Sequence, residues 1–285
     1  MENAFLNNSL VLPAPAKLNL FLHITGRRAD GYHLLQTLFQ FLDYSDEISL
    51  QLRTDGKITR SLGSPLVPEN DDLVVKAARL LQQTTACKLG VDIKVNKKLP
   101  MGGGLGGGSS DAATVLVGLN CLWHCGLSID ALAALGLRLG ADVPVFVRGE
   151  SAWAEGVGEV LEPVTIPEKW YFVLHPHVHI STAEIFATES LTRNCKPSRM
   201  AAFLAGQTTN VFEPVVRKNY PKVAEAFEWL GNKAKLTGSG ACLFAEFDDE
   251  KSAQIIAKNL PKQWSGFVAQ GRCKSPLYEK LNTLS

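Results

Sequence analysis

The sequence predicts an α+β protein of two domains. Residues 16–25 alternate cleanly between the two faces of a strand, and further strand-like runs follow, so the first part of the chain is expected to be rich in β-structure. Helical and strand patterns then succeed one another in the second part, which favours a layered α+β arrangement. The composition loosens around residues 156–163. We therefore expect one domain over residues 1–160 and another over residues 161–285.

Each expected element rests on its own periodicity and on its end signals. In the first domain we expect strands at residues 16–25, 34–42, 47–52 and 91–96, and helices at 73–83, 112–122 and 128–139. Residues 70–72 would cap the first of these helices, and Gly140 is a fitting end for the third. In the second domain we expect strands at residues 170–174, 235–236, 241–247 and 266–270, and helices at 182–191, 222–229 and 249–260.

The most informative segment joins the strand at 91–96 to the helix at 112–122. Six of the seven residues 102–108 are glycines. The whole segment is Pro100, Met101, Gly102, Gly103, Gly104, Leu105, Gly106, Gly107, Gly108, Ser109, Ser110. Glycine adopts positive φ freely and lets an anion approach the backbone, so this run predicts a phosphate-binding loop. The helix that follows would add its positive end, with Ser109 or Ser110 as cap, and Lys97 at the strand end would contact the nucleotide.

Other interpretations of the glycine loop fit less well. A P-loop needs lysine where Ser109 stands, and a dinucleotide motif can be threaded through any run of glycines. Asp130 is nearly at the spacing of a ribose-binding acid, but it begins a helix instead of ending a strand. A flexible linker would not be bounded tightly by a strand and a helix.

Composition limits the classes of partner. There are 29 basic and 28 acidic residues, for a net charge of +1, so we expect neither nucleic-acid nor membrane binding. No apolar run approaches the length of a membrane span, and residues 1–12 lack the pattern of a secretory signal. We therefore expect a cytoplasmic location. The six cysteines form no C-x-x-C pair, so we expect reduced thiols. The sequence does not distinguish a monomer from a homodimer.

Two groups of potential metal ligands occur in the sequence. Cys121 and Cys125 could share a helical face, but no second pair of ligands lies near them in sequence. His175, His177 and His179 could share a strand face, but Pro176 interrupts the ladder and no carboxylate or cysteine is close. A strand end followed by a loop is the simpler interpretation.

Three polar residues interrupt otherwise apolar segments. Alternation points Lys17 and Asn19 to the same face of their strand. Asp142 stands alone among apolar residues, where a carboxylate needs a partner. A Lys17–Asp142 pair would explain both residues, and Asn19 would lie beside it.

Five segments together resemble those of a known family. The loop at residues 100–113 resembles the phosphate loop of the GHMP kinases, and residues 15–20, 28–33 and 140–144 narrow the match, with residues 237–241 as a second glycine loop. The resemblance runs in order from Pro13 to about Gln270. It implies the two-domain GHMP kinase fold, with the active site in the cleft between domains.

The resemblance also implies an activity and a set of site residues. The activity is ATP- and Mg²⁺-dependent phosphorylation of the 2-hydroxyl of a cytidine diphosphate derivative of methylerythritol, in the non-mevalonate route to isoprenoid precursors. Lys17 and Asp142 would be catalytic, Asn19 and Asp142 would bind the substrate, and His33 would meet the base with Tyr32 beside it. The magnesium ligands stay open: Ser110 is one candidate, and phosphates with water are another. A nicotinamide oxidoreductase and an inactive sugar-binding relative are the rival functions.

Overall fold

The computed structural model describes residues 8–29, 31–206 and 209–284. Asp30, expected in a turn, and residues 1–7 of the N-terminal segment lie outside those ranges. Ten strands of the described chain join in one sheet, in the order β3-β4-β2-β10-β7-β9-β8, with β1 and β5 also paired to β2 and with β6 paired to β5. The strands are β1 (Ser9–Arg27), β2 (His33–Arg53), β3 (Ile58–Leu62), β4 (Gly90–Asn96), β5 (Ala152–Glu155), β6 (Val160–Pro163), β7 (Trp170–His175), β8 (Lys235–Leu236), β9 (Leu243–Phe247) and β10 (Ser265–Arg272).

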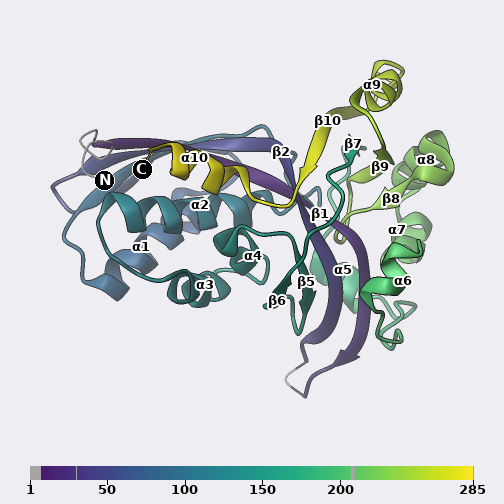
Figure 1. Ribbon diagram of the computed structural model, residues 1–285, viewed down its shortest axis with the longest axis horizontal. Helices are drawn as coiled ribbons and strands as arrows, with labels where there is room; N and C mark the ends of the chain where they lie inside the picture. The colour runs from purple at the N-terminus through teal and green to yellow at the C-terminus, as the bar shows by residue number, and fades with distance from the viewer. Residues whose placement is uncertain (1–7, 30, 207–208, 285) are drawn as a thin grey trace.

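Helices cover this sheet along its length (Figure 1). They are α1 (Leu73–Thr85), α2 (Gly107–Leu122), α3 (Ile129–Leu137), α4 (Val143–Arg148), α5 (Thr182–Ala187), α6 (Met200–Leu204), α7 (Glu213–Asn219), α8 (Pro221–Leu230), α9 (Glu250–Lys258) and α10 (Pro276–Leu284), with short 3₁₀ turns at Glu69–Asp71 and Gly231–Lys233. None of the described helices is long and apolar enough to cross a membrane.

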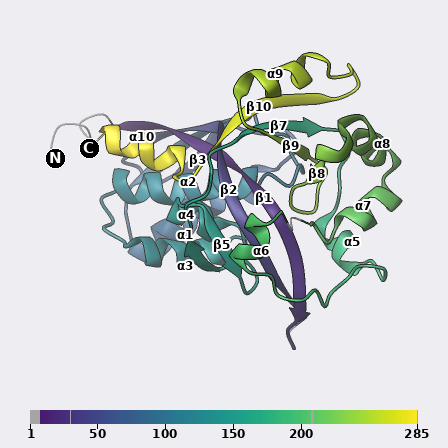
Figure 2. The same ribbon diagram turned by 45° about the vertical axis from the view of Figure 1, so that its right-hand side comes forward.

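The strands β1 and β2 run through the whole molecule and link its two ends, as Figures 1 and 2 show. They pair antiparallel, with irregularities after Pro15, Asn19 and Ile24 that bend the long ribbon. The expected strands at residues 34–42 and 47–52 are therefore one strand of 21 residues. Its continuity could not be predicted because it depends partly on pairing with β4 and β5, which come from later parts of the chain.

Two main cores lie at the ends of this ribbon. In one, α1, α2 and α4 pack on β1, β2 and β4, and Leu277 of α10 joins the same core. In the other, α5, α7 and α8 pack against β7, β8 and β9, and Leu22 and Ile24 of β1 take part. The catalytic candidates on β1 lie between these two cores, where the ribbon passes from one to the other.

Several expected boundaries were wrong. Ser109 and Ser110 lie inside α2, because Gly106 occupies the cap position with φ +74°. The apolar segment after Asp142 is the helix α4, and the helix expected at residues 182–191 ends at Ala187.

The expected helix at residues 73–83 is confirmed, with Asp72 accepting a hydrogen bond from the Val74 N–H as its cap.

Candidate active site

The glycine loop curls between β4 and α2 and requires glycine for two reasons. Gly102, Gly104 and Gly106 have φ of +67°, +73° and +74°, values that side chains with a Cβ rarely adopt. A Cβ on Gly103 would lie 2.6 Å from Cys242 Sγ, and one on Gly104 would lie 2.3 Å from the Thr237 carbonyl oxygen. Both positive φ and close packing therefore require glycine in this loop.

The close packing comes from the second glycine loop, residues 237–241. Its backbone donates from the Ala241 N–H to the Gly102 carbonyl at 3.2 Å, and the following Cys242 N–H donates to the Gly103 carbonyl at 3.1 Å. The Thr237 hydroxyl donates to the Gly104 carbonyl at 3.3 Å. The segment that the sequence indicates as a tight turn therefore supports the first loop.

Lys17 stands where β1 passes this double loop. Its Nζ donates to Asn19 Oδ1 at 2.5 Å and to the Gly104 carbonyl at 3.2 Å, and it lies 3.3 Å from Asp142 Oδ2. The Lys17 side chain is only 3% exposed, whereas that of Asp142 is 36% exposed. Asp142 is therefore less buried than its apolar neighbours suggest, because it precedes α4 at the rim of a cavity.

Hydrogen bonds hold both the side chain and the backbone of Asn19 in place. Its Nδ2 donates to the Thr37 hydroxyl at 2.9 Å, and its backbone N–H donates to the Thr237 hydroxyl at 3.0 Å. Thr37 in turn donates to the Phe21 carbonyl at 2.5 Å. Lys17 and Asn19 share one face, as alternation predicts, and the network holds both in fixed orientations.

A cavity of about 350 Å³ opens over these residues. The residues that line it include Lys17, Asn19, Asp142, Gly102, Gly104, Gly106, Ser109, Thr182, Phe186, Gly238 and Ser239. It therefore combines a cation, a carboxylate, an amide and a glycine-rich backbone, which are the groups that phosphoryl transfer requires.

His33 does not line the cavity itself, but its ring stacks on Phe186, which does. The two rings stack with centroids 4.7 Å apart, and the Arg193 Nε–H donates to His33 Nε2 at 3.3 Å. Because that arginine only donates, Nδ1 of the neutral His33 carries the proton. Burial, together with the charges of Arg193 and Arg27, lowers the pKa of His33. Tyr32 is 65% exposed and stays outside the cavity wall.

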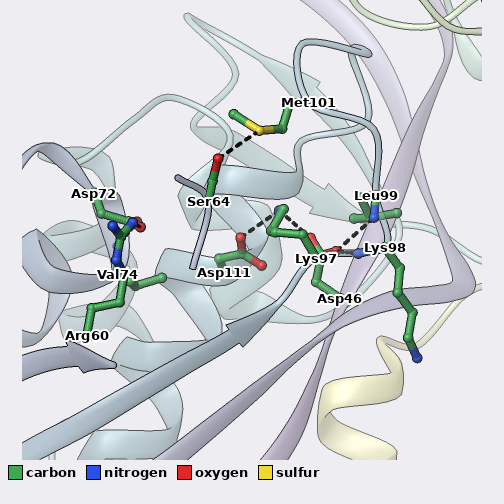
Figure 3. Close-up of polar contacts among 10 residues, drawn as sticks. All are labelled: Asp46, Arg60, Ser64, Asp72, Val74, Lys97, Lys98, Leu99, Met101 and Asp111. Carbon is green, nitrogen blue, oxygen red and sulfur yellow. Dashed lines mark hydrogen bonds and ion pairs between the residues drawn. The ribbon is translucent and has the colours of Figure 1, made fainter. Parts of the chain in front are cut away.

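Lys97 is not among the residues that line the cavity, and its polar contacts are with Asp46 and Asp111 (Figure 3). Its Nζ forms ion pairs with Asp46 Oδ2 and, at 2.8 Å, with Asp111 Oδ2. Burial lowers the pKa of Lys97, but the Asp111 and Asp46 carboxylates outweigh that effect and raise it above its ordinary value. Burial and the nearby Asp46 raise the pKa of Asp111 to about 7 against the opposing effect of Lys97. Met101 also turns outward, with its sulfur 3.4 Å from the Ser64 hydroxyl.

The histidine and cysteine groups hold no metal site within the described residues, where no three His, Cys, Asp or Glu side chains gather around a common point. The rings of His175 and His177 lie 4.8 Å apart, while His179 packs against Gly102. Asp130 lies in the first turn of α3 and pairs with Arg148 at 2.9 Å.

Sequence reasoning missed Thr37, Phe186, Arg193 and the hydroxyl of Thr237. Their neighbours in the site come from segments far away in the chain, so no local spacing could reveal them. The glycines around Thr237 were the single local signal.

Comparison with known proteins agrees with this geometry. Residues 72–150 match the GHMP kinases N terminal domain, and residues 193–266 match the GHMP kinases C terminal family. A 4-diphosphocytidyl-2-C-methyl-D-erythritol kinase of Alkalilimnicola ehrlichii is 57% identical over 271 residues, covering 94% of this chain and 93% of the relative. One from Mannheimia succiniciproducens is 56% identical, covering 98% and 93%.

Solved structures give the same result. A 4-(cytidine 5'-diphospho)-2C-methyl-D-erythritol kinase superposes with a TM-score of 0.81 at 29% identity, covering 92% of this chain and 99% of that one. A mevalonate kinase superposes with a TM-score of 0.65 at 15% identity, over 93% and 99%, which is a likeness of fold. The chain belongs to the GHMP kinases and, within them, to the family of 4-diphosphocytidyl-2-C-methyl-D-erythritol kinases.

Proposed function

We propose that this protein transfers the γ-phosphoryl group of ATP to the 2-hydroxyl of 4-diphosphocytidyl-2-C-methyl-D-erythritol, in the non-mevalonate route to isoprenoid precursors. The observation that carries the proposal is the Lys17–Asp142 contact at 3.3 Å beside the glycine loop. A phosphoryl-transfer enzyme needs a positioned acceptor, a cation against developing charge and a phosphate cradle. The cavity offers all three.

The reaction assigns a task to each side chain. Asp142 accepts a hydrogen bond from the attacking hydroxyl and orients its oxygen toward the phosphorus. The Lys17 ammonium pairs with the Asp142 carboxylate and stabilises negative charge on the transferring group. The Asn19 amide, fixed by Thr37 and Thr237, orients the acceptor from the same strand face.

The nucleotide phosphates lie along residues 102–110, where backbone N–H groups and the start of α2 favour an anion. His33, stacked on the cavity-lining Phe186, meets the cytosine edge in this proposal, with Tyr32 beside it. The pocket residues come from one chain, so the same site serves a monomer or a homodimer. Residues 1–160 and 161–285 are the two domains in this proposal, although β1 and α10 each contribute to the core of the other half.

Magnesium fits this site as a partner of the phosphates. The described residues contain no cluster of acidic or imidazole ligands that would hold it alone. The Ser110 hydroxyl in α2 is buried and has no hydrogen-bond partner, so it is the side-chain oxygen suited to such an ion. When bound, the ion would neutralise phosphate charge. All six cysteines carry free thiols, which suits the cytoplasm.

A coupled assay tests the proposal. The protein is given ATP and, in separate reactions, the cytidine diphosphate substrate, homoserine and mevalonate. We expect turnover with the first acceptor alone. Equal turnover with homoserine or mevalonate would overturn the substrate assignment, and no turnover with any acceptor would favour an inactive relative. NAD binding is measured in parallel: binding of NAD without binding of ATP would support an oxidoreductase, and the reverse would exclude it.

A further inference from the structure

Three titratable side chains meet at the base of the glycine loop, and we call Asp46, Lys97 and Asp111 the loop-base cluster. Lys97 Nζ donates to Asp46 Oδ2 and, at 2.8 Å, to Asp111 Oδ2. Asp46 Oδ1 also accepts from the backbone N–H groups of Lys98, at 2.5 Å, and Leu99, at 2.8 Å. Figure 3 shows these contacts converging on one point.

The three residues come from both sides of the glycine loop in the chain. Asp46 belongs to β2, Lys97 follows the end of β4, and Asp111 is the fifth residue of α2. Lys97 precedes the loop and Asp111 follows it, so their ion pair joins the chain before the loop to the chain after it. Asp46 anchors that junction to the central strand of the sheet.

The burial of the cluster decides what Lys97 can do. The Asp46 side chain is 0% exposed, that of Asp111 is 6% exposed and that of Lys97 is 23% exposed. Withdrawing the ammonium toward a phosphate would leave two buried carboxylates without their shared cation, which is strongly unfavourable. A direct contact between the Lys97 ammonium and an anionic nucleotide is therefore unfavourable.

The loop itself needs such a constraint. Six of its residues are glycines, which lose more conformational entropy on ordering than any other residue. An ion pair that fixes the separation of the two loop ends removes part of that freedom before the ligand arrives, and preorganisation of this kind strengthens binding. A Cβ on Gly107 would lie 3.4 Å from Lys97 Nζ, so the cluster is in contact with the first residue of α2.

We propose that Lys97 and Asp111 are positioning residues for the nucleotide, and that their ion pair holds the two ends of the glycine loop in the binding conformation. This inference rests on the proposed function, because it takes the loop as the phosphate site. It departs from the sequence-based expectation that Lys97 contacts the nucleotide directly.

The test is a double-mutant cycle whose readout is calorimetric binding of ADP with magnesium. The variants are Lys97→Met, Asp111→Asn and the two combined. If the pair positions the loop, each single change weakens ADP binding on the order of tenfold, and the double variant binds no more weakly than the worse single one. If Lys97 is a direct ligand, Asp111→Asn preserves or strengthens binding while Lys97→Met weakens it, and our inference is wrong.

Controls separate this role from general destabilisation. Lys169→Met removes an ammonium that pairs with the exposed Asp248, and it should leave ADP affinity unchanged. Hydrogen exchange of residues 101–106 should accelerate in the loop-base variants, while the KM for the phosphoryl acceptor stays within about twofold. Asp111→Asn keeps the Lys97–Asp46 pair, so this variant tests the inference even if Lys97→Met does not fold. Wild-type protein that fails to bind ADP would overturn the proposed function, whereas normal binding by Asp111→Asn would overturn only the inference.

Discussion

The Nζ of Lys17 lies 3.3 Å from Asp142 Oδ2, yet one partner is almost fully buried and the other reaches the open cavity. The buried lysine is held by Asn19 and the Gly104 carbonyl, and both partners line the cavity, with the carboxylate the more exposed of the two. The arrangement leaves Asp142 free to accept a hydrogen bond from a bound hydroxyl.

Removing either partner should affect turnover more than folding. Asp142→Asn keeps the shape of the side chain and gives up its charge, so we expect kcat to fall on the order of 100-fold while ATP affinity is largely kept. Lys17→Ala should lose as much activity and also lower the melting temperature, since it empties a buried site. Steady-state kinetics and thermal melts of both variants check this. A purely structural pair would show normal kcat in the folded fraction of Asp142→Asn.

The two glycines Gly106 and Gly108 should respond oppositely to alanine. Gly106 has φ +74°, and a Cβ there would lie 2.7 Å from Phe146 Cζ and 3.0 Å from Lys17 Cε. Gly106→Ala should therefore cost roughly 1–3 kcal/mol of stability from backbone strain and also displace Lys17. At Gly108 the nearest atom is 3.7 Å away, and φ is not positive. Gly108→Ala should fold at least as stably as wild type in denaturant titrations; a loss as large as that of Gly106→Ala would contradict the argument.

The local parts of this site could be predicted, and the long-range parts could not. The strand, glycine loop and helix around residues 91–122 follow from periodicity, and so does the shared face of Lys17 and Asn19. The expected role of Lys97 follows from its position next to the loop, but its partner Asp46 lies 51 residues earlier and has no sequence signal. Phe186, Arg193 and Thr237 reach the site only because β1 crosses from one core to the other.

The pH response of His33 follows from its surroundings. Burial, Arg193 and Arg27 lower the pKa of His33, so the neutral ring is the native form at pH 7. The stability that the neutral ring contributes is present above the unfolded value near 6.5 and is lost as the pH falls through the lowered folded value. NMR titration should find the pKa of His33 below 6.5, and Arg193→Met should raise it. An unchanged pKa in that variant would show that Arg193 does not act on the ring.

The same histidine should decide which base is accepted. His33 Nδ1 carries a proton in the neutral form, so it donates to an acceptor on the base edge, while Phe186 holds the ring in place. We expect His33→Ala to lower the preference for the cytidine over the uridine analogue by roughly tenfold, the value of one hydrogen bond in a closed site. Competition between the two analogues measures it. Full selectivity in a folded variant would move base recognition elsewhere.

The hydroxyl of Thr237 should matter as much as any group that touches the substrate. It accepts from the Asn19 N–H at 3.0 Å and donates to the Gly104 carbonyl at 3.3 Å, so one oxygen joins the strand of Lys17 to the glycine loop. Thr237→Val keeps the shape but leaves a buried N–H unpaired, at a cost of about 1–3 kcal/mol. Because Asn19 holds Lys17, we expect kcat to fall together with the melting temperature, and Thr237→Ser to restore both. If Thr237→Val lowers the melting temperature while kcat stays normal, the hydroxyl supports the fold without positioning Asn19 for the reaction.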